Sequence, residues 1–221
     1  MRTSKLFGHI AILWVLLAAI APTALADAEI EALLNDPRWK MIESEHNVRL
    51  YQRPANNTDV HEIKAVSVVP YALKSKIKTM LVEPDLFCDW VHDCMSSEQI
   101  PTPFGYAFAY RMVLDAPFPY TDRETVNKVQ IFEEAGERDC IYFVGQYFDM
   151  GLPEKRNPRR LKVSDGTWRL VRLDDDNVEI TLYFAVDLGG GVPDWGAERF
   201  LKKISARTVS NLMKNAANDN D

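Results

Sequence analysis

The sequence has no excess of basic residues, no internal repeat and no low-complexity tract. Its 221 residues contain 26 lysines and arginines against 32 aspartates and glutamates, which gives a formal net charge of -6 at pH 7. Proteins that bind nucleic acid usually present a basic stripe to the phosphates, so this composition argues against a nucleic-acid partner. It also argues against attachment to anionic lipid by charge alone. No linker divides the chain, and its length suits one compact domain.

The common motifs of catalysis are also missing. The sequence contains neither a Gly-x-Ser-x-Gly nucleophile motif nor a glycine-rich phosphate loop. Beyond residue 26 the ready proton carriers are His46, His61 and His92, and the first two are expected to be exposed. We therefore expect no catalytic residue and no cofactor.

Residues 1–26 have the pattern of a secretory signal peptide. Arg2 and Lys5 precede the apolar stretch Leu6–Ala21, and Ala24–Ala26 gives the small-x-small pattern of a cleavage site. Cleavage after Ala26 predicts a periplasmic or secreted chain. The alternative is an uncleaved membrane anchor, although the apolar stretch falls short of the ~20 residues of a spanning helix.

Cysteine is scarce, which limits both disulfides and metal sites. Export permits a disulfide among Cys88, Cys94 and Cys140, with Cys88–Cys94 as the local pair, but all three pairings stay open. The three could equally be buried small apolar residues. Cys88, His92 and Cys94 lie close together, but tetrahedral zinc usually needs a second pair of ligands, so we expect no metal.

Hydrophobic periodicity predicts an α+β domain over residues 27–215, followed by a polar tail at 216–221. The expected helices are 28–45, 71–82, 83–91 and 193–215. The expected strands are 48–52, 60–69, 98–100, 105–114, 124–132, 139–147, 166–173 and 178–186, with a turn at Pro54–Asn57 between the first two. The short connections imply an antiparallel sheet, and the long last helix is its obvious cover. A curved sheet under one helix leaves room for an apolar cavity.

Three stretches resemble the START (StAR-related lipid transfer) family. They are Ala116–Val126 (APFPYTDRETV), then Leu161–Val163 with Gly166–Leu170 (GTWRL), and finally Tyr183–Phe184, Asp187–Gly190 (DLGG) and Val192–Trp195 (VPDW). The resemblance covers residues 45–212. Leu188, where proline is common, and Glu124, in place of the usual aspartate, depart from the family pattern.

The resemblance implies a helix-grip fold, in which a curved antiparallel sheet wraps around the long C-terminal helix. It also implies an internal hydrophobic tunnel that takes one lipid, with the C-terminal helix and nearby loops as the lid. The expected function is a non-enzymatic carrier or sensor of a phospholipid, fatty acid or other acyl lipid, with transient membrane contact. One alternative is an enzyme like the cyclases and aromatases of the same superfamily, with Arg123, Tyr110 or Asp115 as weak candidates. The other is an interaction module with a filled core.

Arg123 is the most prominent charge of the resemblance. It either meets a phosphate or carboxylate head group or pairs with Asp122 or Asp115 to hold the turn. Alternation along the following strand places Arg123, Thr125, Asn127, Val129 and Ile131 on the tunnel face and leaves Glu124, Lys128 and Gln130 facing solvent.

Val129 stands where some steroid-binding START members carry a buried arginine, which favours an acyl chain as the ligand. Asn127 is either a polar anchor for the ligand or a core amide with its own partners. The expected ligand-binding residues are Arg123, Asn127, Val129, Tyr110, Tyr142, Phe184, Trp195, Phe200 and Ile204.

Overall fold

The computed structural model describes residues 21–53, 60–134, 136, 139–154, 157–189 and 191–218. Most of the predicted signal peptide, the predicted turn at Pro54–Asn57 and the last three residues of the polar tail lie outside these ranges. The chain forms two compact units, which divide between Asp36 and Pro37. The first contributes the helix α1 (Ala21–Leu34), which includes the predicted cleavage position. No helix among the described residues combines the length and apolar composition of a bilayer-spanning segment.

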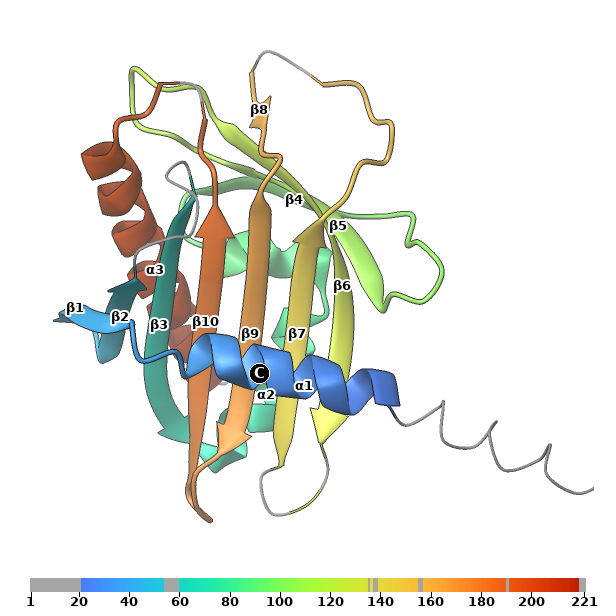
Figure 1. Ribbon diagram of the computed structural model, residues 1–221, viewed down its shortest axis with the longest axis vertical. Coiled ribbons are helices and arrows are strands. Elements are labelled where there is room, and N and C mark those ends of the chain that lie inside the picture. Colours follow the sequence, from blue (N-terminus) through green and yellow to red (C-terminus); the bar gives the residue numbers. More distant parts are fainter. Residues whose placement is uncertain are drawn as a thin grey trace, which may run out of the picture. The chain divides into compact units, whose positions relative to one another are not determined.

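The second unit is a ten-stranded sheet with a long C-terminal helix (Figure 1). Its strands are β1 (Lys40–Glu45), β2 (Val48–Arg53), β3 (His61–Pro70), β4 (Cys94–Ile100), β5 (Phe108–Leu114), β6 (Arg123–Glu134), β7 (Cys140–Tyr147), β8 (Arg159–Arg160), β9 (Ser164–Arg172) and β10 (Asn177–Val186). Its helices are the 3-10 turn η1 (Tyr71–Leu73), α2 (Lys74–Leu81), the 3-10 helix η2 (Pro84–Asp89) and α3 (Asp194–Ala217).

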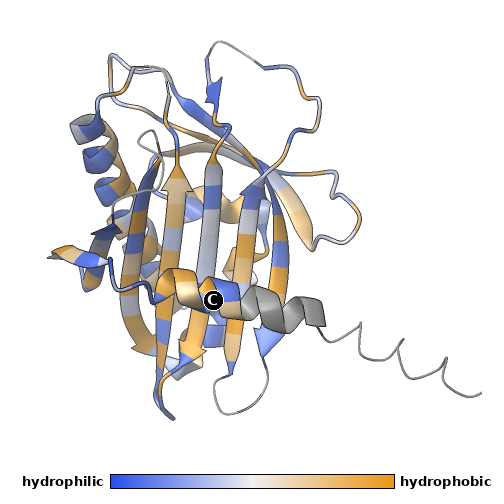
Figure 2. Cartoon of the chain, in the orientation of Figure 1, coloured by the Kyte–Doolittle hydropathy of each residue, from blue (hydrophilic) through white to orange (hydrophobic). Residues whose placement is uncertain are grey.

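The strand order is β1-β2-β3-β10-β9-β7-β6-β5-β4, antiparallel throughout, and the short β8 runs parallel to β6. Hydrophobic and hydrophilic residues alternate along much of the sheet (Figure 2), and the strands from β2 to β10, apart from β4, contain buried residues, whereas β1 and β4 have no buried residue. α3 lies against β2 and β3, and its apolar stripe joins the core of the sheet through Leu201, Ile204, Val209 and Leu212. This arrangement confirms the predicted helix-grip fold.

The predicted helix at 28–45 was wrong in its second half, because residues 40–45 form β1. Pro37 cannot continue a helix. His46 and Asn47 both adopt a left-handed backbone, with φ of 53° and 64°, which is typical of a two-residue hairpin turn. After α1 the chain therefore enters β1, and the turn at His46 and Asn47 pairs β1 with β2 in an antiparallel hairpin.

Glu124 was predicted to face solvent, and the structure corrects this. Its side chain is only 2% exposed and accepts hydrogen bonds from Arg111 Nε at 2.6 Å and Arg160 Nε at 2.5 Å. Arg160 belongs to β8, which pairs with the start of β6 and covers this end of the strand. Arg160 also donates to the carbonyls of Leu152 and Pro153, so one buried carboxylate fixes the long β7–β8 connection to the sheet.

We predict that Glu124→Gln lowers the free energy of unfolding by about 3 kcal/mol, because it leaves a buried arginine without its counter-charge. Urea denaturation monitored by circular dichroism measures this. The matched control is Glu98→Gln, which removes a second partner of the same Arg111 at 3.1 Å but from a side chain that is 57% exposed. It should cost less than about 1 kcal/mol. Equal effects of the two substitutions would contradict the buried network.

Candidate functional site

The core of the second unit is incompletely filled between the sheet and α3. An inner cavity of about 110 Å³ lies between the strands β5, β6, β7, β9 and β10 on one side and η2 and α3 on the other. Its lining is almost wholly apolar: Leu81, Phe87, Trp90, Val91, Phe108, Tyr110, Met112, Leu114, Val129, Phe143, Gly145, Gly166, Trp168, Leu182, Phe184, Ile204, Ser205 and Thr208. Such a lining suits an apolar ligand.

Two glycines at the centre of the sheet create this space. Residues paired directly across the strands form the row Phe108, Val129, Gly145, Gly166 and Phe184, all of which line the cavity. Neither glycine has a positive φ, so the backbone does not require glycine here, and glycine inside a strand is destabilising. A Cβ atom would make only ordinary contacts, at 3.5 Å from the Gly166 carbonyl oxygen for Gly145 and at 3.4 Å from the Phe184 ring for Gly166. The missing side chains therefore enlarge the cavity.

Aromatic rings from η2, from the residue that follows it and from the sheet line the same cavity. Phe87 packs edge-to-face on Trp90 and on Tyr110, with ring centroids 5.3 and 5.2 Å apart, and Trp90 packs on Trp168 at 5.8 Å. Such pairs contribute beyond their buried area. They give η2, which carries Phe87, a fixed position over the sheet.

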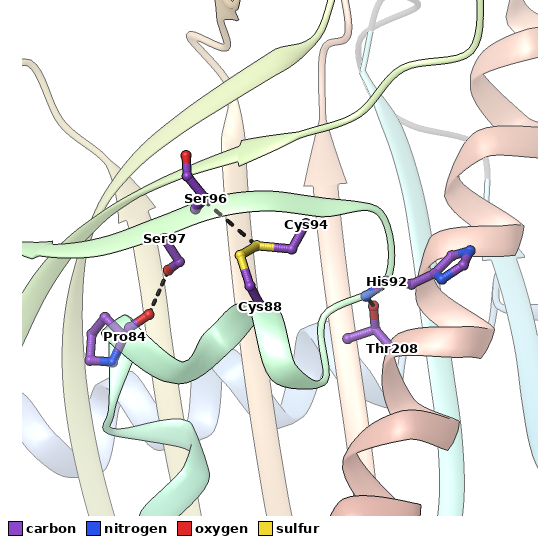
Figure 3. Close-up of a disulfide and its surroundings, with 7 residues drawn as sticks. All are labelled: Pro84, Cys88, His92, Cys94, Ser96, Ser97 and Thr208. Carbon is purple, nitrogen blue, oxygen red and sulfur yellow. Dashed lines mark hydrogen bonds between the residues drawn. A yellow bond between two sulfur atoms is a disulfide. The ribbon is translucent and has the colours of Figure 1, made fainter.

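A disulfide holds the same wall from outside. Cys88 in η2 is bonded to Cys94 at the start of β4 (Figure 3), so the local pair is the one that forms, and these two sulfurs are not available to a metal. Cys140 is buried in β7. Among the described residues, no group of three or more histidine, cysteine, aspartate or glutamate side chains is placed to hold a metal ion.

Arg123 does not reach the inner cavity. Its Nε donates to the Leu188 carbonyl at 2.9 Å, and its Nη1 donates to the backbone carbonyl and the hydroxyl of Thr121. Burial, followed by the nearby charge of Arg159, lowers the pKa of this guanidinium. Arg123 therefore joins the β5–β6 connection to the segment after β10 through carbonyl oxygens.

Asn127 has its hydrogen bonds satisfied within the protein. Its Nδ2 donates to the Ser164 carbonyl at 2.7 Å, and its Oδ1 accepts from the Ser164 hydroxyl at 2.8 Å. It also hydrogen-bonds the hydroxyl of Tyr110, its partner across β5 and β6. Burial raises the pKa of Tyr110 to about 12, so this phenol stays neutral at physiological pH.

The remaining expected residues divide between two places. Val129, Phe184, Ile204 and Tyr110 line the inner cavity, whereas Trp195, Phe200 and Arg123 line a second hollow described below. Tyr142 lines neither. Its neighbour Phe143 lines the inner cavity, and consecutive strand residues point to opposite faces.

The second hollow, which we call the mouth, has a volume of about 440 Å³. It lies between the β5–β6 connection, the segment after β10 and the first turns of α3, and it is lined by Asp93, Ala116, Pro117, Phe118, Pro119, Tyr120, Arg123, Leu188, Val192, Trp195, Gly196, Arg199, Phe200 and Lys203. The mouth and the inner cavity follow one another along α3, because Phe200 and Lys203 line the first and Ile204 lines the second. Phe118 is 97% exposed at its rim, and Trp195 is also exposed.

Several solved protein structures share this architecture. Human STARD10 superposes with a TM-score of 0.74 at 15% sequence identity, over 89% of this chain and 80% of that one. A StAR-related lipid transfer protein of Xanthomonas axonopodis superposes with a TM-score of 0.70 at 20% identity, over 82% of this chain and 99% of that one. Human StAR-related lipid transfer protein 5 superposes with a TM-score of 0.72 at 17% sequence identity, over 90% of this chain and 96% of that one.

The chain has a START-domain fold. By sequence, an uncharacterized protein of Pseudomonas aeruginosa is 24% identical over 180 residues, which cover 79% of this chain and 84% of that protein. No family model matches the sequence. The apolar cavity of this chain lies between the sheet and α3, which is where the resemblance had implied a tunnel.

Sequence reasoning missed several residues of the cavity wall, among them Gly145, Trp90 and Ser205. Gly145 stands alone in an otherwise apolar strand pattern, and an isolated glycine in a strand is a signal of close approach or of missing bulk. Trp90 and Ser205 carry no comparable signal, because a tryptophan in a short helix and a serine on an amphipathic helix are both common.

We predict that the double variant Gly145→Ala/Gly166→Ala is more stable than the wild type and has a smaller cavity. Alanine at compatible strand positions should raise the free energy of unfolding by about 1 kcal/mol in total, while two methyl groups occupy cavity volume. Urea denaturation gives the first quantity. Xenon occupancy in pressurised crystals gives the second, since xenon enters dry apolar cavities. Unchanged xenon occupancy would show that these glycines do not set the cavity size.

Proposed function

We propose that this chain binds an apolar lipid, with an acyl chain in the inner cavity, and carries or senses it outside the cytoplasm. The observation that carries the proposal is the cavity lining. Among the described residues, the lining includes no lysine, arginine, histidine or carboxylate, and the one ionisable group among them is the neutral Tyr110. Each buried methylene stabilises a bound chain by about 0.8 kcal/mol. Several solved structures with this fold are named for lipid transfer, which supports the same role here.

The sizes of the two hollows imply that the protein opens to load its ligand. The inner cavity of about 110 Å³ is small beside the ~300–1,000 Å³ of ordinary ligand pockets. The mouth of about 440 Å³ lies next to it along α3. We infer that the β5–β6 connection and the start of α3 move apart, so that the ligand joins the two hollows.

The rim of the mouth supports transient contact with a membrane. Phe118 and Trp195 expose apolar rings there, and aromatic rings favour the membrane interface. Arg199, Lys203 and Arg207 follow Trp195 along the exposed face of α3 at helical spacing. Lys203 is paired with Asp93 at 2.9 Å, so the positive charge that suits anionic lipid comes from Arg199 and Arg207.

Two features support a location outside the cytoplasm. One is the signal-peptide pattern of residues 1–26. The other is the Cys88–Cys94 disulfide, because disulfides persist in oxidising compartments and are rare in the cytosol.

The purified chain should carry a stoichiometric lipid, which native mass spectrometry followed by organic extraction would identify. If it arrives empty, incubation with phospholipids, fatty acids and sterols should load it. An empty chain after every incubation would overturn the proposal. A covalently altered ligand recovered after incubation would instead favour an enzyme.

We predict that Phe118→Asp slows the transfer of a fluorescent phospholipid between anionic vesicles by about tenfold or more, because a rim ring no longer enters the membrane. The matched control is Phe104→Asp, since Phe104 is just as exposed (105% against 97%) but precedes β5, whereas Phe118 follows it. Transfer rates that fall equally in both variants would contradict membrane contact through the mouth.

A further inference from the structure

Two residues that line the inner cavity each carry a buried polar atom without a hydrogen-bond partner in the described part of the chain. These atoms are the indole Nε1 of Trp90 and the hydroxyl oxygen of Ser205. Both residues line the cavity, and their side chains are 3% and 1% exposed. Buried polar groups nearly always have a partner, and each exception calls for an explanation.

Neighbouring polar groups of the cavity each have a hydrogen-bond partner within the protein. Tyr110 is hydrogen-bonded to Asn127, and the Thr208 hydroxyl accepts from the His92 backbone N–H at 3.1 Å (Figure 3). A serine in a helix can bond back to a carbonyl of the preceding turn, but the Ser205 hydroxyl does not. Trp90 Nε1 and Ser205 Oγ therefore differ from the hydroxyls of Tyr110 and Thr208 in having no hydrogen-bond partner among the described residues.

The two groups belong to adjoining parts of the wall. His92, two residues after Trp90, is bonded to Thr208, which follows Ser205 by three positions on the same side of α3. The backbone after Trp90 thus lies directly against the part of α3 that carries Ser205. Because the cavity is small, one molecule that fills it contacts both residues.

We infer that Trp90 Nε1 and Ser205 Oγ form a polar subsite for one uncharged oxygen of the ligand. An indole N–H only donates and a hydroxyl can donate, so their common complement is an acceptor such as a carbonyl, ester or hydroxyl oxygen. No cationic side chain lines the cavity, and an anion buried there without one would lose its hydration uncompensated. The ligand is then an apolar molecule with a neutral oxygen function inside the cavity, and not a pure hydrocarbon. This inference rests on the proposed lipid binding and names the ligand chemistry of that site.

The test compares 2-dodecanone with dodecane, both radiolabelled, by equilibrium dialysis against wild type, Ser205→Ala and Trp90→Phe. The quantity of interest is the ratio of the two dissociation constants, because hydration of each ligand is the same for every variant and cancels. We expect the ratio to shift against the ketone by about tenfold in each variant. Dodecane itself should bind Ser205→Ala about as well as wild type.

Thr125→Val is the matched control. The Thr125 hydroxyl is also buried and without a partner, but Thr125 does not line the cavity. Removing it should leave the ratio unchanged. Without ligand, Ser205→Ala should be at least as stable as wild type, since it removes an unsatisfied hydroxyl.

The possible results distinguish failure of the proposed subsite from failure of the proposed lipid binding. If both ligands bind and the ratio is the same in all four proteins, the subsite is wrong while lipid binding stands. If a crystal structure with the ketone bound shows the ketone oxygen away from both Trp90 and Ser205, the subsite is likewise overturned. If neither ligand binds wild type, the proposed function fails and the subsite fails with it.

Discussion

Successive side chains of a strand point to opposite faces of the sheet, so every second side chain of this sheet points toward the face that α3 covers. One long helix cannot fill the space in front of so many strands. Most of the space is taken by aromatic and aliphatic side chains from the strands, η2 and α3. Gly145 and Gly166 contribute none, and they face each other at the centre of the row that runs from Phe108 to Phe184. The cavity, its apolar lining and its position next to the mouth all depend on this shortage of side-chain volume.

The polar interactions of the fold keep that space open and shaped. Glu124 binds two arginines at one end of β6, and Arg123 connects the β5–β6 connection to the segment after β10 through carbonyl oxygens. Asn127, Ser164 and Tyr110 satisfy one another beside the cavity. The charged groups of Glu124 and Arg123 therefore fix the connecting segments of the sheet. The described lining of the cavity itself is uncharged, as a site for an apolar ligand requires.

The sequence predicted the strands well where one face is buried, because a period of two is then enforced by the core, as from His61 to Pro70. The long amphipathic α3 was predicted within two residues of its ends for the same reason. The β1–β2 hairpin was missed because His46 and Asn47 lack the glycine of the usual Asn-Gly or Asp-Gly turn signal, although both take the left-handed backbone. Burial of Glu124 was missed because alternation places a side chain on a face but cannot show that a distant segment, here β8, covers that face.

Similar reasons limit what could be predicted of the site. The resemblance led to Val129, Phe184 and Ile204 on the cavity wall, whereas the partners of Arg123 and Asn127 depend on segments far along the chain, at Leu188 and Ser164. Unsatisfied atoms such as Trp90 Nε1 are visible only when every possible partner has been placed.

If the space between the sheet and α3 receives an acyl chain, a crystal structure of the protein grown with 1-bromododecane should show that chain in place. We expect an anomalous bromine peak inside the cavity lined by Phe108, Gly145, Gly166 and Ile204. A crystal saturated with 1-bromododecane that shows bromine only on the outer surface of the protein, with the inner cavity unchanged, would contradict acyl-chain binding in this space.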